Sequence, residues 1–121
     1  TKDQHVLVNE LAPRPHNSGH YTIEGCVTSQ YENHIRAILG LPLGSTELIR
    51  PTVMKNIIGN VNKKAEVHGL EEAYKYPEVK IHIYGKEECR VGRKMGHITV
   101  TDKTIEDALF KARYAHSKIK F

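Results

Sequence analysis

Two segments of the chain carry apolar residues at helical spacing. In the first, Ser29 followed by Glu32 forms a capping box, and Gly40 is suited to end a helix. This predicts a helix over roughly 29–39, with one apolar face made of Tyr31, Ile35, Ile38 and Leu39. In the second, Thr104 should cap a last helix whose apolar stripe consists of Ile105, Ala108, Leu109 and Ala112. We expect both stripes to belong to the core.

Other segments have the patterns of strands. Residues 79–84 alternate apolar and polar positions, which predicts a half-buried strand. Residues 96–101 should pair with it as a hairpin through the loop 85–93, and residues 51–58 should form a further strand. Weaker patterns predict a short buried strand over 5–10, an extended stretch or turn over 22–27, a short helix over 70–76 and a closing strand over 119–121.

The composition is that of an ordinary globular chain. With 121 residues, 39% of them hydrophobic, one domain or one and a half with a modest core is expected. No apolar run approaches the roughly 18 residues of a membrane span, and the chain does not open on a signal-peptide pattern. Cys26 and Cys89 lie far apart without metal-type spacing, so we expect reduced thiols in a cytoplasmic protein.

The net charge is +4, and the basic residues are spread unevenly, because four of them cluster at one predicted loop that also carries Glu87 and Glu88. Lys86, Arg90, Arg93 and Lys94 fall within nine residues, which suits a single phosphate group better than a nucleic-acid duplex. Glycines at 85 and 92 would let the backbone approach a ligand closely. A solvated basic loop without a ligand is the ordinary alternative.

Segment 9–20 concentrates chemically active side chains. Prolines on both sides of Arg14 force an extended backbone, which would aim its guanidinium at a phosphate or carboxylate; an unbound surface arginine is the alternative. Glu10, at the end of a predicted strand, suits a Mg²⁺ ion that also contacts nucleotide phosphates, although it could instead cap a loop. His16 and His20 have a spacing that suggests zinc, but the residues between them are turn-forming and no third ligand follows.

Three blocks of the chain, Asn9–Thr22, Thr28–Ile38 and Arg93–Val100, resemble one enzyme family in the same order. This family is the 5-(carboxyamino)imidazole ribonucleotide synthases of the ATP-grasp superfamily, and the resemblance covers about residues 6–100. It implies an α+β fold in which residues 1–44 are the last strand, site loop and helix of an ATP-grasp domain. Residues 48–121 would be a small, mostly antiparallel β C-terminal domain with a helix. We therefore expect a C-terminal piece of a longer enzyme.

The resemblance also implies an activity. The intact enzyme would be an ATP-dependent carbon–nitrogen ligase of purine biosynthesis that carboxylates aminoimidazole ribonucleotide with bicarbonate, using ATP and Mg²⁺. It would be a cytoplasmic homodimer without nucleic-acid or membrane partners, and the piece alone would be inactive.

The family's site residues carry over to this sequence at matching positions. The resemblance places Asn9 and Glu10 at the nucleotide and metal, and Arg14 at the reacting carboxyl group as the catalytic residue. Beside the ribonucleotide it places His16, Asn17 and Ser18, with Lys86 and Arg93 on the 5′-phosphate. One departure is Arg90-Val91-Gly92, where the family often has Arg-Pro-Gly, which leaves the position of Arg90 open.

Two other readings stay open at this point. The formate-dependent glycinamide ribonucleotide transformylases share a similar Pro-Arg-Pro-His loop, but that loop continues Asp-Thr-Gly where this chain has Asn17-Ser18-Gly19. A small RNA-binding module could use the basic loop, but the chain has Tyr84 without a paired aromatic platform and no tryptophan.

Overall fold

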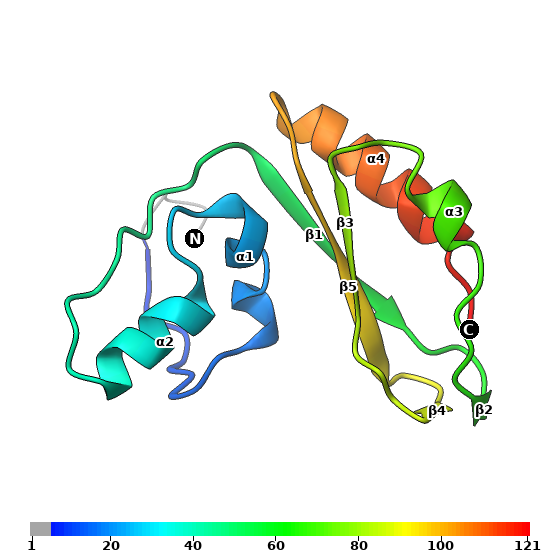
Figure 1. Cartoon of the computed structure of the whole chain (residues 1–121), viewed down its shortest axis with the longest axis horizontal. Helices are drawn as coiled ribbons and strands as arrows, with labels where there is room; N and C mark the ends of the chain where they lie inside the picture. The colour runs from blue at the N-terminus through cyan, green and yellow to red at the C-terminus, as the bar shows by residue number, and fades with distance from the viewer. Residues whose placement is uncertain (1–5) are drawn as a thin grey trace.

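The computed structural model describes residues 6–121, which form a helical N-terminal part and a sheet-based C-terminal part (Figure 1). The two short helices of the first part lie on one side of the sheet, and the longest helix lies on the other (Figure 1). The elements in chain order are η1 (Asn17–Gly19), α1 (Thr22–Gly25), α2 (Gln30–Ile38), β1 (Thr52–Ile58), β2 (Lys63–Lys64), α3 (Leu70–Ala73), β3 (Val79–Ile83), β4 (Glu88–Cys89), β5 (Lys94–Thr101) and α4 (Ile105–Lys118).

The main sheet has three antiparallel strands in the order β1-β5-β3. Strand β3 pairs with β5 from Val79 opposite Val100 to Ile83 opposite Gly96, which confirms the predicted pairing of these two segments. Strand β1 pairs with the other edge of β5 and confirms the predicted strand over 51–58. The connection between β3 and β5 is more than a plain hairpin loop, because β4 lies within it and pairs with β2.

Alternation along the strands gives the sheet an apolar face and a polar face. The apolar face packs against α4, and the contact consists of Ile57, Val79, Ile98 and Val100 from the sheet and Ala108, Ala112 and Ala115 from the helix, all of them buried. Three alanines at helical spacing let the helix lie close to the strands. The polar face of the sheet lies against the helical N-terminal part.

Replacing Ala112 by leucine should destabilise the chain. Ala112 is fully buried between α4 and the sheet, so three added carbon atoms would push the two layers apart at a cost of roughly 1–3 kcal/mol. Arg113→Leu, at the next and exposed position of the same helix, is the matched control. Urea unfolding should show a lower midpoint with an unchanged slope for Ala112→Leu only. Equal midpoints for both variants would contradict this packing.

The ends of α2 follow the predicted capping chemistry. The Ser29 hydroxyl accepts a hydrogen bond of 3.1 Å from the backbone N–H of Glu32, so Ser29 is the N-cap. Gly40 has a φ of 66°, the left-handed conformation with which helices commonly end. The helix predicted over 29–39 is therefore confirmed as Gln30–Ile38.

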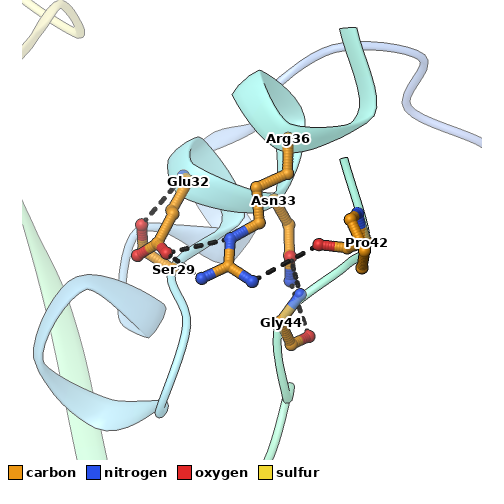
Figure 2. A network of polar contacts seen from close by, with 6 residues as sticks. All are labelled: Ser29, Glu32, Asn33, Arg36, Pro42 and Gly44. Atoms are coloured by element: carbon orange, nitrogen blue, oxygen red, sulfur yellow. Dashed lines mark hydrogen bonds and ion pairs between the residues drawn. The ribbon is translucent and has the colours of Figure 1, made fainter. Parts of the chain in front are cut away.

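The side chains of α2 also hold the segment that follows the helix (Figure 2). The Asn33 amide accepts from the backbone N–H of Gly44 at 2.8 Å and donates to its carbonyl at 3.3 Å. Arg36 pairs with Glu32 at 2.6 Å and donates to the carbonyl of Pro42 at 3.3 Å. These contacts fold residues 40–44 back along the helix.

The predicted burial of the helix stripes is largely wrong. On α2 the apolar residues are exposed, Tyr31 by 40%, Ile35 by 54%, Ile38 by 66% and Leu39 by 65%, because no described element covers this face. On α4, Ile105 and Leu109 are also partly exposed, since the helix turns its alanine side toward the sheet.

Four further predictions need correction. No strand is present over the described residues 6–10, where Val6 is 98% exposed, because no described segment pairs with them; position 5 lies outside the described residues. Of the extended stretch or turn predicted over 22–27, the turn is present as one helical turn over 22–25, closed by the Gly25 N–H to the Tyr21 carbonyl at 2.9 Å, and the extended alternative is wrong there. Helix α3 ends at Ala73, short of the predicted 76, and the expected closing strand is only one bridge between His68 and Lys120.

The fold class is α+β, as predicted. Met95 belongs to the buried interior, and both cysteines are buried and free, which agrees with the expectation of reduced thiols. Among the described residues, none of the helices has the length and apolar character that a membrane crossing requires.

Candidate functional site

Some of the predicted residues of the N-terminal loop lie in an exposed segment, and three of them line one hollow. Asn9 and Glu10 lie in an exposed segment without regular structure. Glu10, Arg14 and His16 line one hollow of about 180 Å³, so the structure brings these three together. The Arg14 guanidinium is exposed, and it donates one long hydrogen bond of 3.4 Å to the neighbouring carbonyl of Pro15. Its fork is therefore available to a ligand.

The loop that follows is held in one conformation by the Gln30 amide. Gln30 accepts from the backbone N–H of His16 at 2.9 Å and donates to its carbonyl at 2.8 Å. It also donates to His20 Nδ1 at 2.8 Å. A Cβ on Gly19 would lie 2.5 Å from the Gln30 Oε1 atom, so only glycine fits beside this amide. The turn over 16–20 is thus held by hydrogen bonds to the side chain of Gln30.

His16 and Ser18 support each other within the loop. The backbone N–H of Ser18 donates to His16 Nδ1 at 3.2 Å, and the Ser18 hydroxyl lies 2.9 Å from the same atom. Because a backbone N–H can only donate, Nδ1 must accept, and the neutral ring carries its proton on Nε2. His16 can therefore offer a hydrogen-bond donor at Nε2. Nδ1 accepts a hydrogen bond in both His16 and His20, whereas a histidine that binds zinc through Nε2 would donate from Nδ1, which argues against the zinc interpretation of this pair.

Asn17 is directed at the sheet. Its amide donates to Asn56 Oδ1 at 2.7 Å and accepts from Asn56 Nδ2 at 3.0 Å. This reciprocal pair uses half of the hydrogen-bonding capacity of each amide. The predicted contact of Asn17 with a substrate would have to use the remainder.

The predicted basic residues meet in a second hollow. Lys86 and Arg93 line a depression of about 300 Å³ together with Glu87, Glu88 and Arg90. Glu88 pairs with Arg90 at 2.6 Å, and its carbonyl accepts from Arg93 at 3.1 Å. Gly85 and Gly92 have φ values of 62° and 80°, and a Cβ would meet nothing within 4 Å at either. These glycines are therefore required by the backbone conformation, and crowding plays no part.

Five polar residues that the sequence analysis did not single out as site residues lie between the helical part and the sheet. His82 Nε2 lies 2.6 Å from Glu24 Oε1, and its ring stacks on that of His97 at a centroid distance of 4.3 Å. The Tyr84 hydroxyl lies 2.9 Å from His97 Nδ1, and the His20 ring is 5.1 Å from the His97 ring. Tyr84 is therefore engaged by protein groups, unlike an open stacking platform for RNA bases.

Burial shifts the pKa of three members of this cluster. His97 is 2% exposed, and burial, together with the neighbouring His82 and His20, lowers its pKa to about 4. Burial also lowers the pKa of His20, with Lys94 acting in the same direction, and raises the pKa of the Tyr84 hydroxyl. His97 is neutral at physiological pH.

Acidification should destabilise the chain as pH falls from about 6.5 to 4. In this window an unfolded His97, with its ordinary pKa of 6.5, binds a proton that the folded chain excludes until pH is about 4. Stability is therefore complete above the unfolded pKa, and the loss reaches roughly 3 kcal/mol at 1.36 kcal/mol per pH unit. Thermal unfolding as a function of pH should show a flatter curve for His97→Gln. Identical curves for the two proteins would contradict the assigned shift.

The donor set at Glu10 fits Mg²⁺ only in part. Mg²⁺ uses one or two carboxylates together with phosphate and water oxygens, and Glu10 supplies one carboxylate. Within residues 6–121 there is no group of three His, Cys, Asp or Glu residues that could hold a metal ion. Further ligands would have to come from a nucleotide or from protein outside these residues.

Two family models match the chain. The ATP-grasp domain matches residues 1–31, and the phosphoribosylaminoimidazole carboxylase C-terminal domain matches residues 52–111. The two matches place the chain in the ATP-grasp class, with a segment like the ATP-grasp domain followed by one like the phosphoribosylaminoimidazole carboxylase C-terminal domain.

Individual relatives show which family within the ATP-grasp class the chain is similar to. The N5-carboxyaminoimidazole ribonucleotide synthase of Bacillus subtilis is 57% identical over 82% of this chain and 25% of its own length. The crystal structure of the Thermotoga maritima synthetase is 57% identical with a TM-score of 0.92, covering 99% of this chain and 34% of that one. An Aspergillus clavatus synthase in complex with ADP and aminoimidazole ribonucleotide is 43% identical with a TM-score of 0.72, covering 86% and 28%.

The chain belongs to the N5-carboxyaminoimidazole ribonucleotide synthase family. It spans about a quarter of the length of the Bacillus subtilis relative that it matches.

Proposed function

We propose that this chain is the C-terminal part of an ATP-dependent carbon–nitrogen ligase that carboxylates aminoimidazole ribonucleotide with bicarbonate in purine biosynthesis. The observation that carries the proposal is the presence, on one scaffold, of a hollow with Arg14 and His16 and a basic loop with Lys86 and Arg93. The first suits a carboxyl group that is being activated, and the second suits a phosphate. The Aspergillus clavatus relative, solved in complex with ADP and aminoimidazole ribonucleotide, supports the choice of these ligands.

The proposed reaction has two steps. ATP transfers its γ-phosphoryl group to bicarbonate, and the substrate amine then attacks the activated carboxyl carbon, forming the C–N bond as phosphate leaves and the amine loses a proton. Arg14 would stabilise the charge that develops on the carboxyl and phosphoryl oxygens. His16 would donate from Nε2 to a substrate oxygen or nitrogen, and Asn17 and Ser18 of the same loop would also contact the ribonucleotide. Lys86 and Arg93 would hold the 5′-phosphate.

The nucleotide end would lie at Asn9 and Glu10. Glu10 is the residue of this segment that would hold Mg²⁺, which would supply charge neutralisation at the nucleotide phosphates. We propose that residues 1–44 close the ATP-grasp domain and residues 48–121 form the C-terminal domain. Two backbone hydrogen bonds, Val27 N–H to the Glu47 carbonyl at 2.9 Å and Ile49 N–H to the Gly25 carbonyl at 2.7 Å, would tie these parts together.

The intact enzyme would be cytoplasmic and homodimeric. The free, buried Cys26 and Cys89 suit a reducing compartment. The chain alone would show no turnover, because the ATP-grasp model matches only residues 1–31 of it.

The proposal is tested by substrate choice in the intact enzyme. Release of ADP should require aminoimidazole ribonucleotide together with bicarbonate. The rival ATP-grasp activity predicts stimulation by glycinamide ribonucleotide together with formate instead, and that result would replace our proposal. Binding of single-stranded RNA with a steep salt dependence, in the absence of turnover, would favour the RNA-binding reading.

Replacing Glu10 by alanine in the intact enzyme should lower kcat and raise the Mg²⁺ concentration needed for half-maximal activity. We expect an effect of roughly 10- to 100-fold, the size seen when even an outer partner of a metal ligand is removed. A Mg²⁺ titration of the steady-state rate measures it. Glu71→Ala, an exposed carboxylate in α3, is the control. An unchanged Mg²⁺ dependence in Glu10→Ala would remove this residue from the metal site.

A further inference from the structure

The polar face of the sheet carries a row of three residues, one from each strand. Asn56 of β1 lies directly opposite His97 of β5, and His97 lies directly opposite His82 of β3. Each member of the row meets one residue of the N-terminal part: Asn56 meets Asn17, His97 meets His20, and His82 meets Glu24. The row thus forms a line of polar contacts between the sheet and the helical N-terminal part.

The contacts along the row are short and directional. The amides of Asn56 and Asn17 exchange two hydrogen bonds of 2.7 and 3.0 Å. His82 Nε2 is 2.6 Å from Glu24 Oε1, and the His82 and His97 rings are inclined by only 11°. The partners on both sides are at least half-buried, so the contacts are shielded from water. Such contacts hold the N-terminal part in one position relative to the sheet.

The contacts of this row link the loop that carries one hollow to the strands that lead into the other. Asn17 lies between His16 and Ser18, so the Asn56 contact anchors the loop that carries one hollow. At the other end, β3 and β5 lead directly into the segment 84–93, which carries Lys86 and Arg93. The Tyr84 hydroxyl, bonded to His97 at 2.9 Å, lies at the start of that segment.

We propose that Asn56, His82 and His97 are positioning residues that hold the His16 loop and the basic loop at the separation that one ribonucleotide requires. They would act through Asn17, Glu24 and Tyr84, without touching the substrate. The inference rests on the proposed function, since it assigns both loops to the same ligand. This positioning role predicts that substitutions in the row raise KM for the ribonucleotide more than KM for ATP.

The test compares two asparagines in the intact enzyme. Asn56→Ala should raise KM for aminoimidazole ribonucleotide about 5- to 30-fold and change KM for ATP less than about twofold, because two hydrogen bonds to the loop are lost. Asn33→Ala is the matched control, since its amide also makes two hydrogen bonds, to Gly44 in the segment that follows α2 (Figure 2). It should leave both KM values nearly unchanged. Equal rises in both KM values for Asn56→Ala would overturn the proposal.

A double-mutant cycle separates positioning from simple destabilisation. Asn17→Ala combined with Asn56→Ala should be no worse than the worse single variant, within about twofold, because both changes break the same pair. Effects that multiply would show that the two residues act independently and would overturn the proposal. If Asn56→Ala does not fold, as judged by its thermal transition, His82→Gln breaks the other end of the row and should shift KM for the ribonucleotide in the same direction. An unchanged KM there would count against the row.

One further measurement keeps this inference separate from the proposed function. Turnover of the unmodified enzyme with aminoimidazole ribonucleotide and bicarbonate is measured first, and its absence would overturn the proposed function alone. Amide hydrogen exchange over residues 17–20 does not depend on the substrate. It should be faster in Asn56→Ala than in Asn33→Ala, and equal exchange would overturn the positioning role even in an active enzyme.

Discussion

Replacing Arg93 by alanine in the intact enzyme is expected to raise KM for aminoimidazole ribonucleotide roughly 10- to 100-fold, with KM for ATP nearly unchanged. A charge-assisted contact with phosphate contributes roughly 1.5–3 kcal/mol, and each 1.4 kcal/mol corresponds to a factor of ten. Arg93 lines the basic hollow with Lys86, and the guanidinium already donates to a loop carbonyl, which aims it. Initial rates at varied concentrations of each substrate measure both constants.

The control for this prediction is another exposed arginine. Arg113→Ala, on α4, removes the same charge from the opposite side of the sheet and should leave both KM values unchanged. If Arg93→Ala weakened ATP and spared the ribonucleotide, the basic loop would belong to the nucleotide, and our assignment of the two hollows would be reversed.

Replacing Arg14 by alanine should act on the chemical step. We expect kcat to fall by roughly 10²- to 10³-fold, the size measured when one donor to a developing oxyanion is removed. The two KM values should change much less, because the proposed charge stabilisation is strongest in the transition state. Arg14 is exposed and makes only a long hydrogen bond to Pro15, so its removal should leave the fold intact.

Arg14→Lys refines this test. Lysine keeps the charge but lacks the planar fork, so it should restore only part of the lost rate. A single-turnover measurement separates the chemical step from product release. A full rate in Arg14→Ala, or a loss confined to KM for ATP, would show that Arg14 does not act on the reacting carboxyl group.

Local chemistry made some of the fold predictable. Ser29, Glu32 and Gly40 specify the ends of α2 by themselves, because capping bonds and a positive φ involve only neighbouring residues. The alternation over 79–84 likewise predicts β3, because one face of the strand must be buried.

Features that depend on distant partners were not predictable. The apolar run over 6–8 resembles a buried strand, but a strand requires a neighbour, and none is described for it. The stripe of α2 has the period of a buried face and is nevertheless exposed. Periodicity identifies a face of an element, whereas only the tertiary structure determines what covers it.

The candidate site was predictable to the extent that it carries family motifs. Glu10, Arg14 and His16 do share a hollow, and Lys86 and Arg93 share another. His82 was missed because alternation places it with Lys80 on a polar face that is normally solvated. Its partner Glu24 lies 58 residues away, and no local pattern signals that contact.

The most direct test of the central claim follows the carboxyl carbon. The intact enzyme is supplied with ATP, Mg²⁺, aminoimidazole ribonucleotide and ¹³C-bicarbonate, and the products are observed by ¹³C NMR. We predict a new carbamate signal on the exocyclic amine of the ribonucleotide, formed in equal amount with ADP. Formation of ADP without transfer of the label, or turnover that requires glycinamide ribonucleotide and formate, would contradict the claim.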